Sequence, residues 1–251
     1  MNEKKGSKTM LQLQDLSFRV DAEGEEKTIL DHITFSIPTG KLVAITGPNG
    51  GGKSTTARII AGIEKPTEGR ILLDGEDITE MGITERARAG IGFAFQQPVR
   101  FKGIRVKDLI RLAAGKEISA RHACEYLSAV GLCARDYIDR EVNASLSGGE
   151  LKRIEIATVL AKASKLSLFD EPEAGIDLWS FQNLIEVFEN MRKNIADSSI
   201  VIISHQERIL NIADEIVVLA NGRIREQGTK EEILPGLLRS GTARPDCRGA
   251  A

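Results

Sequence analysis

The stretch that decides the fold is Gly47-Pro48-Asn49-Gly50-Gly51-Gly52-Lys53-Ser54-Thr55, in which residues 47–54 match the phosphate-binding pattern G-x-x-x-x-G-K-[ST]. A short apolar run, Leu42-Val43-Ala44-Ile45-Thr46, precedes it, and residues 54–61 have helical character. Strand, glycine loop and helix are the context in which this pattern forms a phosphate loop. We therefore expect an α/β fold with a nucleotide site at this loop.

The residue types of the loop explain how it would bind phosphates. Gly50, Gly51 and Gly52 have no Cβ, so the backbone can wrap closely around the phosphate groups. The helix that follows presents its positive N-terminus to them. We expect Lys53 to reach the β- and γ-phosphates, and Ser54 to ligate Mg²⁺ while Thr55 adds a phosphate contact.

Acidic and polar residues follow three further apolar runs. Asp170-Glu171 closes the run 166–169; we expect Asp170 to hold the hydration shell of Mg²⁺ and Glu171 to polarise the attacking water. Gln96 follows the run 91–95, and its amide can touch both metal and water. His205 follows the run 200–204, where it can bond the γ-phosphate and hold the water and Glu171 in place.

These residues, together with Leu146-Ser147-Gly148-Gly149-Glu150, resemble the ATP-binding cassette (ABC) ATPase family over roughly residues 11–234. The resemblance implies a P-loop NTPase core with an N-terminal antiparallel β-subdomain and an inserted helical subdomain at about 97–160. We expect one domain over 11–238. Residues 239–251 are rich in Gly, Arg and Ala, and we expect them to form a flexible tail. ATP and Mg²⁺ are the implied substrate and metal, with Lys53, Gln96, Glu171 and His205 in catalytic roles.

The resemblance also implies a nucleotide-dependent homodimer. In the family the segment that corresponds to Ser147, Gly148 and Gly149 contacts the γ-phosphate bound by the other subunit, so hydrolysis needs two chains arranged head-to-tail. Asp177 matches the aspartate of the family's D-loop, whereas Ala174 departs from the usual serine. We expect low intrinsic ATPase activity, and we expect the chain to be a monomer when no nucleotide is bound.

The adenine contact departs from the family's pattern. Many members stack adenine on an aromatic side chain just after the first strand, and the aligned position here is Val20. Phe18 lies two residues earlier on the same face of the expected strand. Either weaker apolar contact holds the base or Phe18 takes the stacking role. We expect modest nucleotide affinity and loose base selectivity.

Composition sets the remaining limits. The net charge of −2 lacks the basic field of a dedicated nucleic-acid binder, so no nucleic-acid partner is expected. No apolar window of ~18 residues is present, which predicts a cytoplasmic chain without direct membrane insertion. The cysteines Cys124, Cys133 and Cys247 form no C-x-x-C pair, and we expect neither a disulfide framework nor a metal site.

The partner is the open question. Residues around Gln96-Gln97-Pro98-Val99 and Ser204-His205-Gln206-Glu207-Arg208-Ile209-Leu210 resemble the SUF iron–sulfur cluster assembly ATPase, SufC. That resemblance implies a soluble SufB/SufD-like scaffold docking near Gln96–Arg105. The alternative is the nucleotide-binding subunit of an importer for a metal ion or small solute, with a permease at the same groove. A DNA-repair or translation ABC protein would need a long insertion or tandem cassettes, which 251 residues do not hold.

Overall fold

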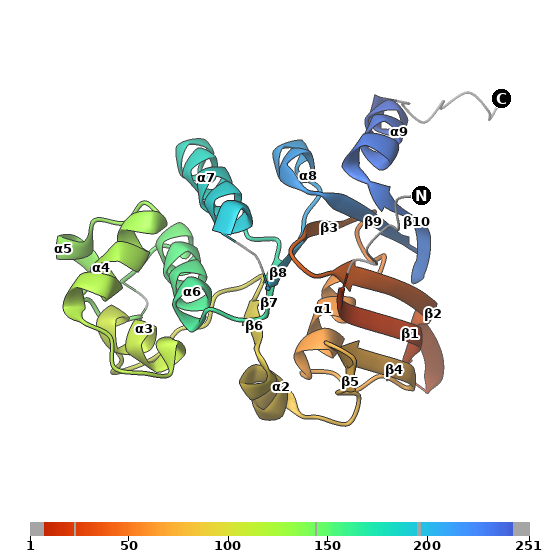
Figure 1. The fold of residues 1–251 in the computed structure, drawn as a ribbon, viewed down its shortest axis with the longest axis horizontal. Coiled ribbons are helices and arrows are strands. Elements are labelled where there is room, and N and C mark those ends of the chain that lie inside the picture. The colour runs from red at the N-terminus through yellow and green to blue at the C-terminus, as the bar shows by residue number, and fades with distance from the viewer. Residues whose placement is uncertain (1–7, 23, 144, 195–196, 243–251) are drawn as a thin grey trace, which may run out of the picture.

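The computed structural model describes residues 8–22, 24–143, 145–194 and 197–242 (Figure 1). The strands are β1 (Thr9–Ala22), β2 (Glu25–Pro38), β3 (Leu42–Thr46), β4 (Glu68–Leu73), β5 (Glu76–Asp77), β6 (Ile91–Ala94), β7 (Leu166–Asp170), β8 (Ser199–Ile203), β9 (Glu215–Ala220) and β10 (Arg223–Thr229). The helices are α1 (Lys53–Ala61), α2 (Ile83–Ala89), α3 (Val106–Ala114), α4 (Ala120–Ala129), α5 (Ala134–Tyr137), α6 (Gly148–Lys162), α7 (Leu178–Asn194), α8 (Glu207–Ile212) and α9 (Lys230–Thr242).

A six-stranded sheet in the order β10-β9-β3-β8-β7-β6 forms the centre of the molecule. The strands from β9 to β6 run parallel, and β10 returns antiparallel to β9. Side chains of β3 alternate between two apolar clusters: Leu42 and Ala44 belong to one, Val43 and Ile45 to the other. This burial on both faces confirms the interpretation of the continuous apolar runs as core strands of a parallel sheet.

The topology determines where polar side chains meet. Because β3, β6, β7 and β8 run parallel, their carboxyl ends lie along one edge of the sheet. The residues that directly follow these ends, or close them, are Gly47, Phe95, Asp170 and Ser204. Ligands of open α/β sheets bind at this edge. The phosphate loop, Gln96, Glu171 and His205 are therefore brought together by the fold.

The second sheet is antiparallel, in the order β2-β1-β4-β5. An apolar cluster that includes Leu11, Leu30 and Ile60 joins it to α1 and the central sheet. The polar turn predicted over residues 21–27 is shorter in the structure, because β1 continues to Ala22 and β2 begins at Glu25. Gly24, with φ +84°, allows this tight reversal.

Helices α3 to α6 form a lobe on the side of the central sheet away from the antiparallel sheet (Figure 1). They occupy the span predicted for an inserted helical subdomain. At the other end of the chain, α9 runs to Thr242, so a helix extends into the segment predicted as a tail from Arg239. The rest of that segment, 243–251, lies outside the described residues.

Two features concern the membrane and the cysteines. Among the described residues, no helix combines the length and apolar character needed to cross a membrane. Cys124 is half-buried and Cys133 is exposed, and both are free thiols. Cys247 lies outside the described part of the chain.

Candidate functional site

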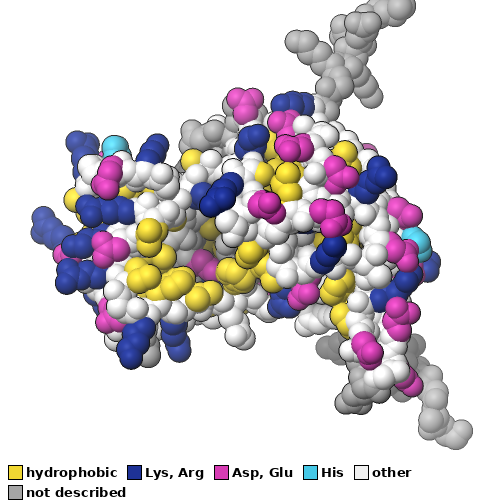
Figure 2. All heavy atoms as spheres, turned by 90° about the horizontal axis from the view of Figure 1, so that it is seen from below, with side chains coloured by type: hydrophobic (Ala, Val, Ile, Leu, Met, Phe, Trp, Pro, Cys, Tyr) yellow, Lys and Arg dark blue, Asp and Glu magenta, His cyan; other side chains and the backbone are white. Residues whose placement is uncertain are grey.

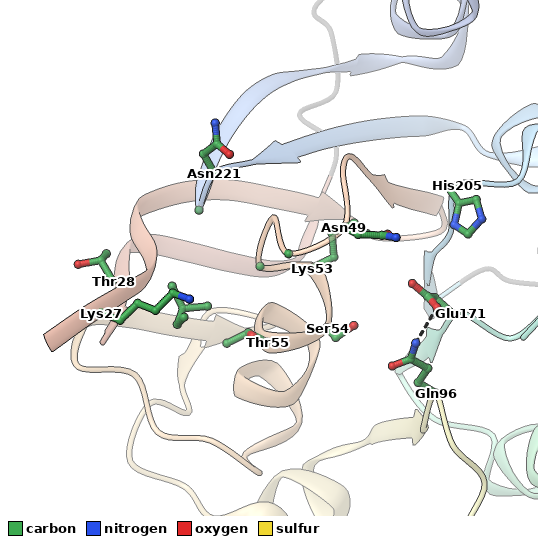
Figure 3. Close-up of a pocket in the computed structure, with 14 residues that line it drawn as sticks. Lys27, Thr28, Asn49, Lys53, Ser54, Thr55, Gln96, Glu171, His205 and Asn221 are labelled. Carbon is green, nitrogen blue, oxygen red and sulfur yellow. Dashed lines mark hydrogen bonds between the residues drawn. The ribbon is translucent and has the colours of Figure 1, made fainter. Parts of the chain in front are cut away.

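A cleft of about 670 Å³ lies at the carboxyl edge of the central sheet (Figure 3). Residues predicted from the sequence supply much of its wall: Asn49, Gly50, Gly52, Lys53, Ser54, Thr55, Gln96, Glu171 and His205. In Figure 3 the phosphate loop lies on one side, and Gln96, Glu171 and His205 face it from the ends of the neighbouring strands. The cleft thus unites residues that lie far apart in the chain, from Asn49 to His205 among those predicted.

The phosphate loop is held by close backbone packing. A Cβ on Gly47 would lie 2.0 Å from the carbonyl oxygen of Leu219, and one on Gly52 would lie 2.5 Å from Cδ2 of Leu30. Both glycines also have positive φ, +137° and +100°. Gly51 and Pro48 support the turn through a hydrogen bond from N–H to carbonyl of 3.1 Å. Side chains at these positions would displace the loop.

Lys53 is the first residue of α1 and is 5% exposed. Its Nζ donates hydrogen bonds to the carbonyls of Gly47 and Pro48 at 2.9 and 3.0 Å. An ammonium group has three donors, so one remains for a phosphate oxygen. The loop therefore holds Lys53 where the helix N-terminus adds to its positive field.

Ser54 and Asp170 form the part of the site that suits a magnesium ion. The Ser54 hydroxyl donates to Oδ1 of Asp170 at 3.0 Å, across the gap between α1 and the end of β7. Asp170 is 1% exposed, and this burial raises its pKa. Hard cations such as Mg²⁺ prefer oxygen ligands, so a buried carboxylate beside a hydroxyl group suits such an ion.

The donor set fits magnesium bound mainly by phosphates and water. Ser54, Asp170 and the Gln96 amide would hold it, and it would neutralise charge on the phosphate oxygens. Among the described residues, no group of three or more His, Cys, Asp or Glu side chains is placed to hold a metal by itself. Such a protein-only cage is also not needed for magnesium in a nucleotide site.

Glu171 and Gln96 form a direct pair. The Gln96 amide Nε2 donates to Oε2 of Glu171 at 2.7 Å, as the dashed line in Figure 3 shows. Glu171 has φ +44°, a left-handed conformation that costs free energy for a non-glycine residue. A backbone hydrogen bond to Ile203 at 3.0 Å holds it there. This geometry directs the carboxylate out of the sheet edge and into the cleft.

His205 and its neighbour reveal a carboxylate that the sequence analysis did not identify. The Ser204 hydroxyl donates to Oε1 of Glu173 at 2.5 Å and accepts from the backbone N–H of Gln206 at 3.0 Å. Burial raises the pKa of Glu173. Glu173 thus supports the turn that carries His205, whose exposed ring lines the cleft.

The signature segment lies apart from the cleft. Ser147 caps α6: its Oγ accepts from the N–H of Glu150 at 3.2 Å, and Glu150 accepts from the N–H of Ser147 at 2.7 Å. Ser147 and Gly148 are exposed, and Gly149 packs towards the carbonyl of Gly175. Asp177 caps α7 by accepting from the N–H of Ser180 at 3.0 Å. Ser147, Gly148, Gly149 and Asp177 do not line the cleft.

The far end of the cleft holds residues that were missed. Lys27, Thr28 and Ile29 of β2 line it, together with Asn221 and Gly222 from the β9–β10 turn. Val20 is not among the lining residues, although it pairs with Lys27 across the β1–β2 ladder. Phe18 packs against the apolar cluster of the second sheet. No local motif marks the missed residues, because strand pairing alone brings them to the loop.

Comparisons with known proteins agree with this geometry. The model of the ABC transporter family matches residues 30–174. An uncharacterized ABC transporter ATP-binding protein of Methanocaldococcus jannaschii is 39% identical, with 82% of this chain and 85% of the relative covered. The sulfate/thiosulfate import ATP-binding protein CysA of Synechocystis is 35% identical over 82% of this chain, which spans 58% of that protein's length.

A solved structure shows the same fold. It is a dimeric ATP-binding cassette in a post-hydrolysis state bound to ADP and Pi, with a TM-score of 0.79 at 24% identity. The similarity covers 88% of this chain and 99% of that one. With a family match over more than half of its residues, the chain belongs to the ABC transporter family and is an ATP-binding, ATP-hydrolysing cassette of that family.

Proposed function

We propose that hydrolysis in this chain uses the residues that face one another across the cleft. Lys53 and the N–H groups of the phosphate loop bind the β- and γ-phosphates, and Ser54, Asp170 and the Gln96 amide would hold Mg²⁺, which would neutralise charge on the phosphate oxygens. Glu171 accepts the proton of the attacking water, and Gln96 holds its carboxylate in place. His205 bonds the γ-phosphate from the opposite wall.

We propose further that two copies close head-to-tail around ATP. Ser147, Gly148 and Gly149 of one copy then contact the γ-phosphate bound by the other. Two observations support this. The segment is exposed at the N-terminus of α6, where backbone N–H groups and the helix dipole favour an anion. It also lies apart from the cleft of its own chain.

An apolar groove beside the cleft is the proposed docking site for the protein that the ATPase drives. It has a volume of about 130 Å³ and is lined by Phe93, Phe95, Val99, Phe101, Leu109, Val142, Leu151, Ile154, Glu155 and Thr158. Val99 is 45% exposed although it is apolar. The observation that carries the proposal is adjacency: Phe95 lines the groove and Gln96, the next residue, lines the cleft.

The charge around the groove indicates the chemistry of its partner. The exposed cations Arg100, Lys102 and Arg105 lie on the loop that also carries Val99 and Phe101. Figure 2 shows apolar side chains gathered in a band on the helical lobe, with Lys and Arg crowded at the outer end of that lobe. We infer a partner segment with apolar side chains that enter the groove and acidic side chains beside them.

We propose that this partner is a membrane permease, which makes the chain the motor subunit of an ABC transporter. The relatives named as import ATP-binding proteins support this over the scaffold partner expected from the sequence. The test is affinity purification of the tagged chain from its own host, with membrane and soluble fractions kept separate. A polytopic permease in the membrane fraction is the expected result.

A second candidate is ATP-driven work on a soluble scaffold of iron–sulfur cluster assembly. The observation in its favour is the sequence around Gln96–Val99 and Ser204–Leu210, which resembles SufC. The docking groove near Gln96–Arg105 would then receive a SufB/SufD-like scaffold. Recovery of a soluble partner with bound iron and sulfide, and no permease, would replace the transporter assignment with this one.

A further inference from the structure

Two charged side chains of α6 are buried against the end of β6. Lys152 is fully buried, and the side chain of Glu155, one turn later, is 13% exposed. Burying these groups in low dielectric is costly, and it lowers the pKa of Lys152 and raises that of Glu155. Burial at this cost in free energy indicates that the two residues have a specific role. Neither of them lines the nucleotide cleft.

The two side chains bind the backbone of one residue, Phe95, at its N–H and at its carbonyl. Oε1 of Glu155 accepts the backbone N–H of Phe95 at 2.9 Å, and Nζ of Lys152 donates to the carbonyl of the same residue. Lys152 Nζ also lies 3.4 Å from Oε2 of Glu155, which has no hydrogen-bond partner within the described residues. The backbone of Phe95, directly before Gln96, is therefore held by a linked ion pair.

Lys152 also reaches the next strand. Its Nζ lies 3.4 Å from the carbonyl of Gln96 and 3.4 Å from that of Asp170, directly before Glu171. One ammonium group thus contacts the backbone on both sides of the Gln96–Glu171 hydrogen bond of 2.7 Å. The position of the Lys152 ammonium group therefore affects the distance between the side chains of Gln96 and Glu171.

We propose that Lys152 and Glu155 are positioning residues for ATP hydrolysis. They act as one unit that fixes the backbone of Phe95 on both sides of its Cα and thereby holds Gln96 against Glu171. The unit stands on α6, whose first residues form the signature segment, so it ties that helix to the root of the Gln96 loop. It binds no part of ATP, and its effect therefore falls on turnover rather than on nucleotide affinity.

Lys162 provides a matched control on the same helix. Its Nζ donates to the carbonyl of Ile91 at 2.6 Å, and burial lowers its pKa as it does for Lys152. Both lysines donate from α6 to a backbone carbonyl, Lys162 to the first residue of β6 and Lys152 to Phe95, the residue directly after β6. Lys162 does so at the start of the strand, far from Gln96, and it represents the purely structural form of the same contact.

The test measures kcat and KM for ATP, together with the thermal midpoint, in Lys152→Met, Glu155→Leu, Glu155→Gln and Lys162→Met. We expect Lys152→Met and Glu155→Leu to lower kcat at least tenfold with KM within twofold. Glu155→Gln keeps an acceptor for the Phe95 N–H and should retain more turnover than Glu155→Leu. Lys162→Met should lower the thermal midpoint and keep kcat within twofold. Equal kcat losses in Lys152→Met and Lys162→Met would overturn the proposal.

The double variant Lys152→Met/Glu155→Leu separates a unit from two independent contacts. We expect its kcat to match that of the single variant with the lower kcat. The two residues act together, and removing both leaves no unpaired buried charge. Multiplied losses in kcat would contradict the proposal. If Lys152→Met does not fold, the comparison of Glu155→Leu with Glu155→Gln carries the test alone.

Discussion

The phosphate loop and the signature segment are both glycine-rich turns at the start of a helix, yet they are built differently. The loop is packed into its own chain: Gly51, Gly52 and Lys53 are buried, and Leu30 and Leu219 press against it. The signature segment is exposed, and a Cβ on Gly148 would meet nothing within 4 Å. One turn has its shape fixed from within, and the other keeps an open outer face for a second molecule.

This difference leads us to expect that a single chain binds ATP but needs a second copy to hydrolyse it efficiently. The loop half of the site needs no partner, since the phosphate loop and His205, on the opposite wall, line the cleft of one chain. The signature half is present but faces away from the cleft of its own chain. Changes in the first region should therefore act on any isolated chain, and changes in the second only on assembled dimers.

Replacing Glu171 by Gln should have the largest effect. The amide cannot accept the proton of the attacking water, so we expect kcat to fall at least ~100-fold, the usual contribution of a general base. ATP binding should persist, and the dimer should accumulate in ATP because hydrolysis no longer releases it. Steady-state phosphate release and size-exclusion chromatography in ATP measure both effects. Glu207→Gln, an exposed glutamate on α8, is the control; unchanged kcat in Glu171→Gln would remove the base role.

Replacing Lys53 by Ala should break the loop half of the site. A charge-assisted hydrogen bond contributes about 1.5–3 kcal/mol, which corresponds to a loss of ATP affinity of roughly 10- to 100-fold. Fluorescence titration with a labelled ATP analogue measures the dissociation constant. Lys65→Ala is the control, because Lys65 pairs with Glu80 on the surface. Full-affinity binding in Lys53→Ala would contradict the assignment of the phosphate loop.

The two regions also differ in how far the sequence predicts them. The loop follows from a local pattern, and Gln96, Asp170, Glu171 and His205 follow from the ends of apolar runs. A parallel sheet brings such ends to one edge, which is why they could be predicted together. No local sequence pattern indicates that Ser147 and Gly148 lie outside the cleft of their own chain. This placement was expected through the family resemblance alone.

Other parts of the site could not be predicted because long-range pairing creates them. Gly222 donates its N–H to the carbonyl of Gly51 at 3.2 Å, and its own carbonyl accepts from Asp31 at 2.9 Å. These contacts join the β9–β10 turn and β2 to the loop. The exposed start of β2 has no buried face, so the sequence there indicated a turn. Lys152 and Glu155 were missed for the opposite reason, since charged helix residues normally face solvent.

Replacing Gly148 by Asp should impair hydrolysis without impairing ATP binding, and so distinguish the signature segment from the phosphate loop. Its own chain has room for the side chain, and an acidic residue in the first turn of α6 suits the helix dipole. We expect wild-type ATP binding and stability, but at least tenfold slower hydrolysis and no ATP-dependent dimer, because the carboxylate would face the γ-phosphate bound by the other copy. Gly148→Ala, which adds size without charge, is the control. An ATP-dependent dimer that persists in Gly148→Asp would argue against the head-to-tail arrangement.

Replacing Val20 by Tyr should have the smallest effect and the opposite sign. Val20 pairs with Lys27, which lines the cleft, so we expect an aromatic ring at position 20 to lie close to the end of the cleft that Thr28 and Ile29 line. Stacking contributes about 1–3 kcal/mol per base in nucleic-acid complexes, and its lower end corresponds to a gain in ATP affinity of about fivefold. Val20→Leu supplies apolar surface without stacking and should stay within twofold of wild type. Because every base has an aromatic face, the gain should extend to GTP. A gain for ATP alone would mean that the cleft already recognises the edge of adenine, for which Lys27, Thr28 and Asn221 supply polar side chains in the lining.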